Sequence, residues 1–123
     1  MCGYSGFILS KSSEFYEETN LKQKFILASQ NISHRGNEPL RTKFYENVLL
    51  SHTRLGFQDL EKSSQPFVSP DGSWVIIFNG EIYNFKNIKE KIKSEFQDNF
   101  KTTGDTEVIL MGFCTMGQKL LNI

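Results

Sequence analysis

The spacing of apolar positions along the chain predicts three helices. Apolar side chains recur at helical spacing in residues 21–32, and this helix is expected to end near Gly36. In residues 85–96 they recur every three or four positions with Lys and Glu between them, which is typical of an amphipathic helix. A third helix is expected to begin after Gly104, because Asp105 and its neighbours are the acidic and hydroxyl side chains that favour a helix N-terminus.

Short apolar runs between these helices predict strands. Residues 6–10 read as a buried strand, and residues 43–54 are rich in the aromatic and aliphatic side chains that favour β structure. Asp71-Gly72 is a hairpin-turn signal, and the continuous apolar run at 74–78 predicts a strand buried on both faces. Loops are expected at residues 11–20 and 66–70. Since strands and helices alternate without a linker or a repeat, we expect one continuous domain of mixed α and β structure.

Composition and charge narrow the classes of partner. The 123 residues include 14 Lys+Arg and 14 Asp+Glu without a long run of either sign, so neither nucleic acid nor an acidic membrane surface is expected as a partner. All apolar runs are far shorter than the roughly 20 residues that a bilayer requires. The two cysteines form no CxxC motif, and no secretory segment is evident, so a reducing cytoplasm is the expected location. We expect small molecules or proteins as partners.

Cys2 is the first candidate for chemistry. Cells commonly remove Met1 when the second residue is small, and Cys2 would then carry both a thiol and a free α-amine. An α-amine has a reference pKa of about 7.7 to 8.0, well below that of lysine, so part of it is neutral at pH 7 and can act as a base. A nucleophile and a base in one residue need no separate histidine. The alternative is a terminal cysteine without a catalytic role.

Asn79 and Gly80 directly follow the apolar run at 74–78 and allow two interpretations. Asn-Gly between apolar segments is a strong signal for a type I′ hairpin turn. Alternatively, the Asn amide and the Gly backbone N–H form an oxyanion hole at the end of a rigid strand.

Arg54 and Asp105 are the candidate binding residues. Arg54 follows apolar residues, so it forms either a structural salt bridge or a fork for a ligand carboxylate. Asp105 either caps the third helix or binds a ligand ammonium. The two histidines, His34 and His52, have no partner at a spacing that indicates a triad or a metal site, so no metal is predicted.

The order and wording of these motifs resemble a known family. The chain is similar to the N-terminal glutaminase half of asparagine synthetase, a class II glutamine amidotransferase. The matching segments are MCG, HRGN, LSHTRLGFQDL, QPF, VIIFNGEIYNF and TTGDTEVIL. One departure is Asn37, which stands where this family usually has Pro after HRG.

The resemblance implies a fold and a set of roles. The implied fold is an α+β, N-terminal-nucleophile hydrolase type, a four-layer α/β/β/α sandwich of antiparallel sheets that is truncated here. Residues 1–123 would be the N-terminal portion of the amidotransferase domain, with the synthetase domain absent. The implied catalytic residues are Cys2 as the nucleophile, with Asn79 and Gly80 stabilising the oxyanion. The implied substrate-binding residues are Arg54 for the glutamine α-carboxylate, and Asp105 with Glu81 for its α-ammonium group.

The implied substrate is L-glutamine, and the released ammonia passes to the synthetase domain. That domain uses ATP and Mg²⁺, so no cofactor is expected in this segment. Other interpretations stay open: the acceptor is a sugar in polysaccharide synthesis, another amide is hydrolysed, or the chain is an inactive remnant that acts as a binding or oligomerisation module. The chain is expected to be a fragment, and a homo-oligomer is one of the arrangements left open.

Overall fold

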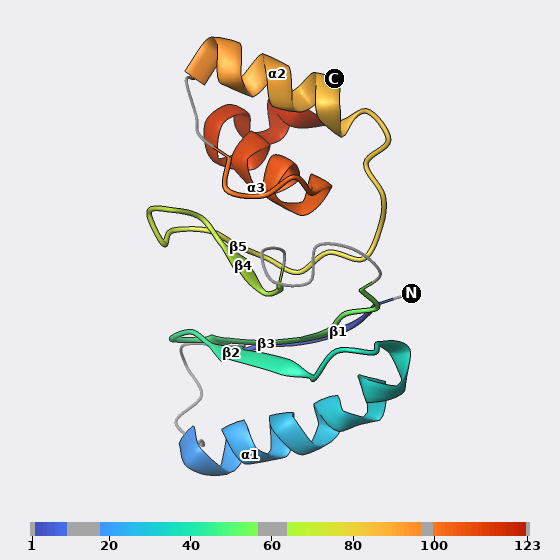
Figure 1. The fold of residues 1–123 in the computed structure, drawn as a ribbon. Helices are drawn as coiled ribbons and strands as arrows, with labels where there is room; N and C mark the ends of the chain where they lie inside the picture. Colours follow the sequence, from blue (N-terminus) through green and yellow to red (C-terminus); the bar gives the residue numbers. More distant parts are fainter. Residues whose placement is uncertain (1, 10–17, 57–63, 97–99, 123) are drawn as a thin grey trace. The chain divides into compact units, whose positions relative to one another are not determined.

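The protein forms two compact units, Met1–Gln58 and Asp59–Ile123. The computed structural model describes residues 2–9, 18–56, 64–96 and 100–122. Each unit combines helices with a small antiparallel sheet (Figure 1), so the expected α+β class is confirmed, while the four-layer sandwich stays a prediction. Within the described ranges, no helix has the length and apolar character needed to cross a membrane.

The first unit is a three-stranded sheet with a helix along one face (Figure 1). The strand order is β1-β3-β2, and both pairings are antiparallel, with Gly3 opposite Thr53 and Arg41 opposite His52. The elements are β1 (Gly3–Ile8), α1 (Glu18–Ser29), the 3-10 helix η1 (Gln30–Arg35), β2 (Arg41–Phe44) and β3 (Val48–Thr53). The strand expected at 6–10 therefore begins earlier, and the β-rich stretch at 43–54 is a strand pair. Most of the loop expected at 11–20 lies outside the described residues.

Three serine hydroxyls link α1 to the sheet. The Ser5 hydroxyl is 2.9 Å from that of Ser29 at the end of α1 and 2.7 Å from that of Ser51 on β3. Ser29 and Ser51 are buried. Each of these two buried hydroxyls therefore has a hydrogen-bond partner where the helix meets the sheet.

The first helical segment ends at Arg35, before Gly36, as the sequence predicts. Glycine is required at position 36 for a steric reason and not as a left-handed helix cap. Gly36 has an extended backbone, with φ −131° and ψ 166°, so it is not the left-handed residue that commonly ends a helix. A Cβ at this position would lie 2.4 Å from the Thr53 Oγ1 and 2.5 Å from the Arg54 carbonyl oxygen. Glycine is needed here because the backbone passes directly against the end of β3.

The second unit has a helical core. Its elements are β4 (Phe67–Val68), β5 (Val75–Ile76), α2 (Phe85–Phe96), α3 (Asp105–Met116) and the 3-10 helix η2 (Gly117–Asn122). The helices expected at 85–96 and after Gly104 are both present. They pack against each other through buried apolar side chains, which are Ile88, Ile92, Val108, Met111 and Leu120. Cys114 on α3 is half-buried.

The Asp71-Gly72 turn is confirmed by its geometry. β4 and β5 pair antiparallel across it, and Gly72 has a φ of 74°, which favours glycine. Hydrogen bonds from the Ser69 hydroxyl, and then from Ser73, lower the pKa of the Asp71 carboxyl to about 2. The Asp71 carboxylate therefore stays ionised to a lower pH than an ordinary aspartate, and it accepts hydrogen bonds from both serine hydroxyls.

The strand predicted at 74–78 is shorter and less buried than expected. Only Val75–Ile76 pair as β5, these residues are half-buried, and Trp74 is 49% exposed. The prediction that this strand is buried on both faces is therefore wrong. Its partner β4 lies inside the expected loop at 66–70 and contributes two residues, so among the described residues most of the apolar run is not paired with a strand.

Beyond the paired residues of β5, a side chain binds the backbone of the apolar run. The buried Gln65 donates from its Nε2 to the Phe78 carbonyl oxygen at 3.1 Å and accepts the Phe78 N–H through its Oε1. The same Nε2 lies 3.4 Å from the Thr106 hydroxyl on α3. One amide thus continues the hairpin pairing and ties the hairpin to a helix.

We expect Gln65→Ala to destabilise the protein by about 2 to 3 kcal/mol, because two backbone groups of Phe78 lose their partner. Denaturant unfolding of the variant and the parent measures the difference. Gln23→Ala, at an exposed position on α1, is the matched control and should change the free energy of unfolding by less than about 0.5 kcal/mol. Equal stability of the two variants would contradict this role for Gln65.

Candidate functional site

Cys2 is held from two sides in the first unit. It is half-buried and immediately precedes β1. The Leu55 backbone N–H donates to the Cys2 Sγ at 3.3 Å, and the Arg35 Nε donates to the Cys2 carbonyl oxygen at 3.2 Å. A residue next to a chain terminus is commonly frayed. Here both its thiol and its backbone are fixed by residues from distant parts of the sequence.

Arg54 directly follows β3 and pairs with Glu38. Its Nη1 lies 3.2 Å from the Glu38 Oε1, and the two side chains are only 17% and 14% exposed. The salt bridge left open by the sequence is therefore present. It leaves the carboxylate-binding role of Arg54 a prediction, because an acidic partner can also orient a guanidinium toward a ligand.

Asn79 and Gly80 do not form the hairpin turn that Asn-Gly suggested. The chain continues from β5 into α2 rather than into another strand. A type I′ turn needs positive φ at both central residues, and Gly80 is not among the described glycines with positive φ. The turn interpretation is wrong. Asn79, Gly80 and Glu81 are exposed in the connection between β5 and α2.

Asp105 binds this same connection. It is the first residue of α3, and Gly104 occupies the N-cap position, so the capping alternative for Asp105 is wrong. Its Oδ2 instead accepts the Ile82 N–H at 3.0 Å. The second unit therefore places Asp105 against the residue that follows Glu81.

Glu107 stabilises the loop that leads into α3. It is only 3% exposed, and its carboxylate accepts the backbone N–H of Lys101 at 2.8 Å and that of Thr102 at 2.6 Å. The Thr102 hydroxyl donates to it at 2.7 Å. These bonds fix the loop that presents Asp105.

The predicted site residues fall into two groups. In the first unit, Cys2 binds Leu55, which directly follows Arg54. In the second unit, Asp105 binds Ile82, which directly follows Glu81. The individual roles of all six residues stay predictions. Several side chains that support them were not predicted. Four of these lie in the quoted motifs, namely Arg35, Asn37, Gln65 and Glu107, and the fifth, Glu38, directly follows HRGN.

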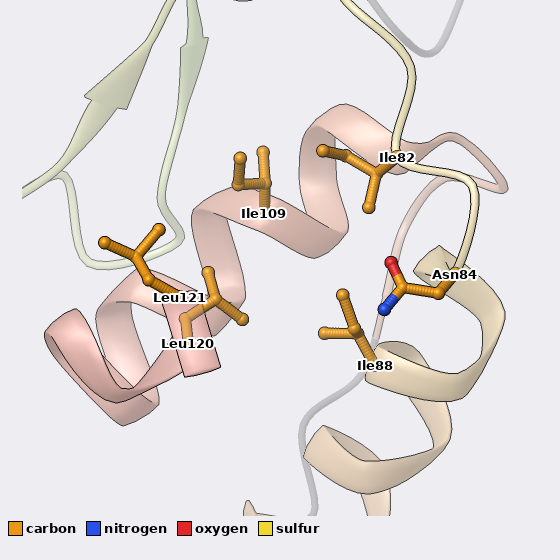
Figure 2. Close-up of a pocket in the computed structure, with 6 residues that line it drawn as sticks. All are labelled: Ile82, Asn84, Ile88, Ile109, Leu120 and Leu121. Carbon is orange, nitrogen blue, oxygen red and sulfur yellow. The ribbon is translucent and has the colours of Figure 1, made fainter. Parts of the chain in front are cut away.

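The second unit also contains an apolar cavity of about 170 Å³ between α2, α3 and η2 (Figure 2). Five aliphatic side chains and one amide line it, and these are Ile82, Asn84, Ile88, Ile109, Leu120 and Leu121. It offers no charged partner to the carboxylate or ammonium group of a free amino acid. The cavity is therefore a poor site for such a ligand.

Comparison with known proteins decides the family. The whole chain, residues 1–123, matches the family model described as glutamine amidotransferase domain. The chain belongs to this family of glutamine amidotransferase domains. This confirms the resemblance on which the expected fold and roles depend. It also places the chain among enzyme domains.

The curated relatives of this amidotransferase domain are asparagine synthetases. It is 35% identical over 102 residues to "Probable asparagine synthetase [glutamine-hydrolyzing]" of Schizosaccharomyces pombe, which covers 83% of the chain and 18% of the relative. It is 36% identical over 110 residues to "Asparagine synthetase [glutamine-hydrolyzing] 2" of Bacillus subtilis, and the match covers 89% of the chain and 14% of the relative. For "Asparagine synthetase [glutamine-hydrolyzing] 2" of Arabidopsis thaliana the identity is 32% over 102 residues, covering 83% and 17%. The amidotransferase domain thus spans less than a fifth of each relative.

The described residues contain no cluster of three or more side chains suited to a metal ion. His34 is exposed at the end of η1, and His52 is buried on β3. Neither residue lies at a position that the proposed chemistry of an amidotransferase domain would require.

Proposed function

We propose that this domain hydrolyses L-glutamine to glutamate and ammonia, with Cys2 as the nucleophile. The observation that carries the proposal is the match of residues 1–123 to the glutamine amidotransferase domain family. The structure supports it in one respect above others: the Cys2 thiol is fixed by the Leu55 N–H rather than left on a frayed end. A fixed thiol is a requirement for attack at a defined carbon.

The proposed reaction has two steps. Once Met1 is removed, the Cys2 thiol gives its proton through a water to its own α-amine, and Sγ bonds to the side-chain amide carbon of glutamine. The C–N bond then breaks, the α-ammonium returns a proton to the leaving nitrogen, and ammonia and a glutamyl thioester result. In the second step water gives a proton to the α-amine while its oxygen bonds to the thioester carbon, the C–S bond breaks, the α-ammonium returns the proton to Sγ, and glutamate leaves. The Asn79 amide and the Gly80 N–H are proposed to donate to the oxyanion in both steps. Because the chain itself supplies every group, this step is proposed to need no cofactor.

Recognition of glutamine is proposed to use both charged ends of the free amino acid. Arg54 would bind the α-carboxylate, while Asp105 and Glu81 would bind the α-ammonium group. Glu38 supports this role for Arg54, because its carboxylate holds one nitrogen of the guanidinium at 3.2 Å and restricts its orientation. A glutamine within a peptide lacks both charges and would be rejected.

The names of the relatives support a proposal for how the released ammonia is used. Their printed names describe glutamine-hydrolysing asparagine synthetases, so we propose that the ammonia serves asparagine or a related amide synthesis. The partner would be an ammonia-accepting synthetase domain, and ATP and Mg²⁺ would act there. We also propose the four-layer sandwich of the N-terminal-nucleophile hydrolases as the fold of the complete domain.

Arg54→Lys tests the proposed substrate class. We expect KM for glutamine to rise by about 10- to 100-fold with little change in kcat, because a lysine cannot reproduce the two parallel bonds of a guanidinium to a carboxylate. Glutamate release at varied glutamine concentration measures both constants. Arg41→Lys, at an exposed position of β2, is the matched control. An unchanged KM in Arg54→Lys would exclude Arg54 as the group that binds the α-carboxylate of glutamine.

A further inference from the structure

We propose that Asn37 is a positioning residue for the Cys2 thiol, acting through Gly56 and Leu55. The inference rests on the proposed function and extends it to a residue outside the six predicted ones. Asn37 follows η1 and Gly36, and its side chain reaches the segment that follows β3.

The Asn37 side chain binds both backbone polar groups of Gly56. Its Oδ1 accepts the Gly56 N–H at 2.9 Å, and its Nδ2 donates to the Gly56 carbonyl oxygen at 3.0 Å. Gly56 is buried, and buried backbone groups without a partner are costly. The reciprocal pair therefore fixes the position of this peptide segment.

The residue held next to Gly56 is the one that contacts the nucleophile. The Leu55 N–H donates to the Cys2 Sγ at 3.3 Å, and the Leu55 Cα joins its peptide directly to the next one, whose Gly56 N–H is bound by Asn37. A backbone N–H aimed at sulfur stabilises the negative charge that Sγ carries during attack. Small displacements of such a donor lower the rate strongly.

Arg54 is held independently of the Asn37 side chain. Its carbonyl oxygen accepts the backbone N–H groups of Asn37 at 3.0 Å and of Glu38 at 3.1 Å, and its guanidinium pairs with Glu38. A truncated side chain at position 37 leaves these bonds in place. The Arg54–Leu55 peptide, which also carries the N–H that donates to the Cys2 Sγ, then loses its anchor on the Gly56 side and can tilt about the remaining bonds. The effect should therefore appear in kcat, expressed per mole of folded enzyme, and not in KM. A general loss of structure would instead lower the apparent kcat together with the thermal stability.

The test measures glutamate release, thermal stability and labelling of Cys2 in the purified parent protein and in Asn37→Ala. We expect kcat to fall by about 10- to 100-fold, with KM within about threefold of the parent value. Asn31→Ala is the matched control, because the Asn31 Nδ2 also makes one bond, to the Ala28 carbonyl oxygen at 3.0 Å, but on an exposed part of η1. It should leave kcat unchanged.

Asn37→Asp keeps the inference testable if the alanine variant does not fold. It retains an acceptor for the Gly56 N–H but faces the Gly56 carbonyl with a carboxylate oxygen, so the same loss of kcat is expected. A folded variant with the parent kcat, or a change confined to KM, overturns the role of Asn37. A parent protein that releases no glutamate overturns the proposed function itself, and with it this inference.

Discussion

Cys2→Ala is expected to lower the rate of glutamate release by about 1,000-fold or more, because removal of a covalent nucleophile leaves only binding and oxyanion stabilisation. The fold should survive the change. The thiol makes one described bond, to the Leu55 N–H, while the Cys2 carbonyl still accepts from Arg35. Steady-state glutamate release and thermal unfolding of the same preparations separate loss of chemistry from loss of structure.

Cys114→Ala is the matched control for Cys2. Cys114 is the other cysteine of the chain, but it lies half-buried on α3 and has no part in the proposed reaction. Its replacement should leave the rate near that of the parent. If Cys2→Ala retains a rate within about tenfold of the parent, covalent catalysis by this thiol is excluded.

Asn79→Ala is expected to lower kcat by about 100- to 1,000-fold, the range measured when one donor of an oxyanion hole is removed. KM should change little, because the proposed bond forms only when the amide carbonyl becomes an oxyanion. Asn79 is exposed, so its truncation should not affect the free energy of unfolding. Single-turnover and steady-state rates on glutamine measure the effect.

Asn87→Ala provides the control for Asn79. Asn87 is an exposed residue of α2, eight positions further along the chain, where alanine also suits the helix. Its kcat should equal that of the parent. A kcat for Asn79→Ala within about threefold of that value would remove Asn79 from the oxyanion site.

The helices were predictable because each depends on a local pattern. The apolar spacing in 85–96 sets the face of α2 that meets α3, so the bounds Phe85–Phe96 agree with the expectation. The Asp71-Gly72 turn was equally local, since the positive φ of Gly72 is a property of one residue. Such features follow from periodicity and backbone sterics, whatever the rest of the chain does.

Features that depend on distant partners were not predictable. The apolar run 74–78 carries a strand pattern, but β structure needs a neighbouring strand, and within the described part of the chain two residues of β4 supply it. Likewise, Asn-Gly at 79–80 predicted a hairpin turn, but the chain continues from β5 into α2 rather than into a second strand. The bonds from Arg35 and Leu55 to Cys2 span 33 and 53 positions, and no local pattern encodes them.

The most direct test of Cys2 as the nucleophile for glutamine is labelling by a diazo-ketone analogue of glutamine, followed by intact and peptide mass measurement. The account predicts a single adduct on Cys2, on chains that lack Met1, with protection by free L-glutamine. The absence of an adduct from chains with a trimmed N-terminus, or an adduct that free glutamine does not prevent, would contradict it. The chain would then keep the motifs of an amidotransferase without forming a glutamine site.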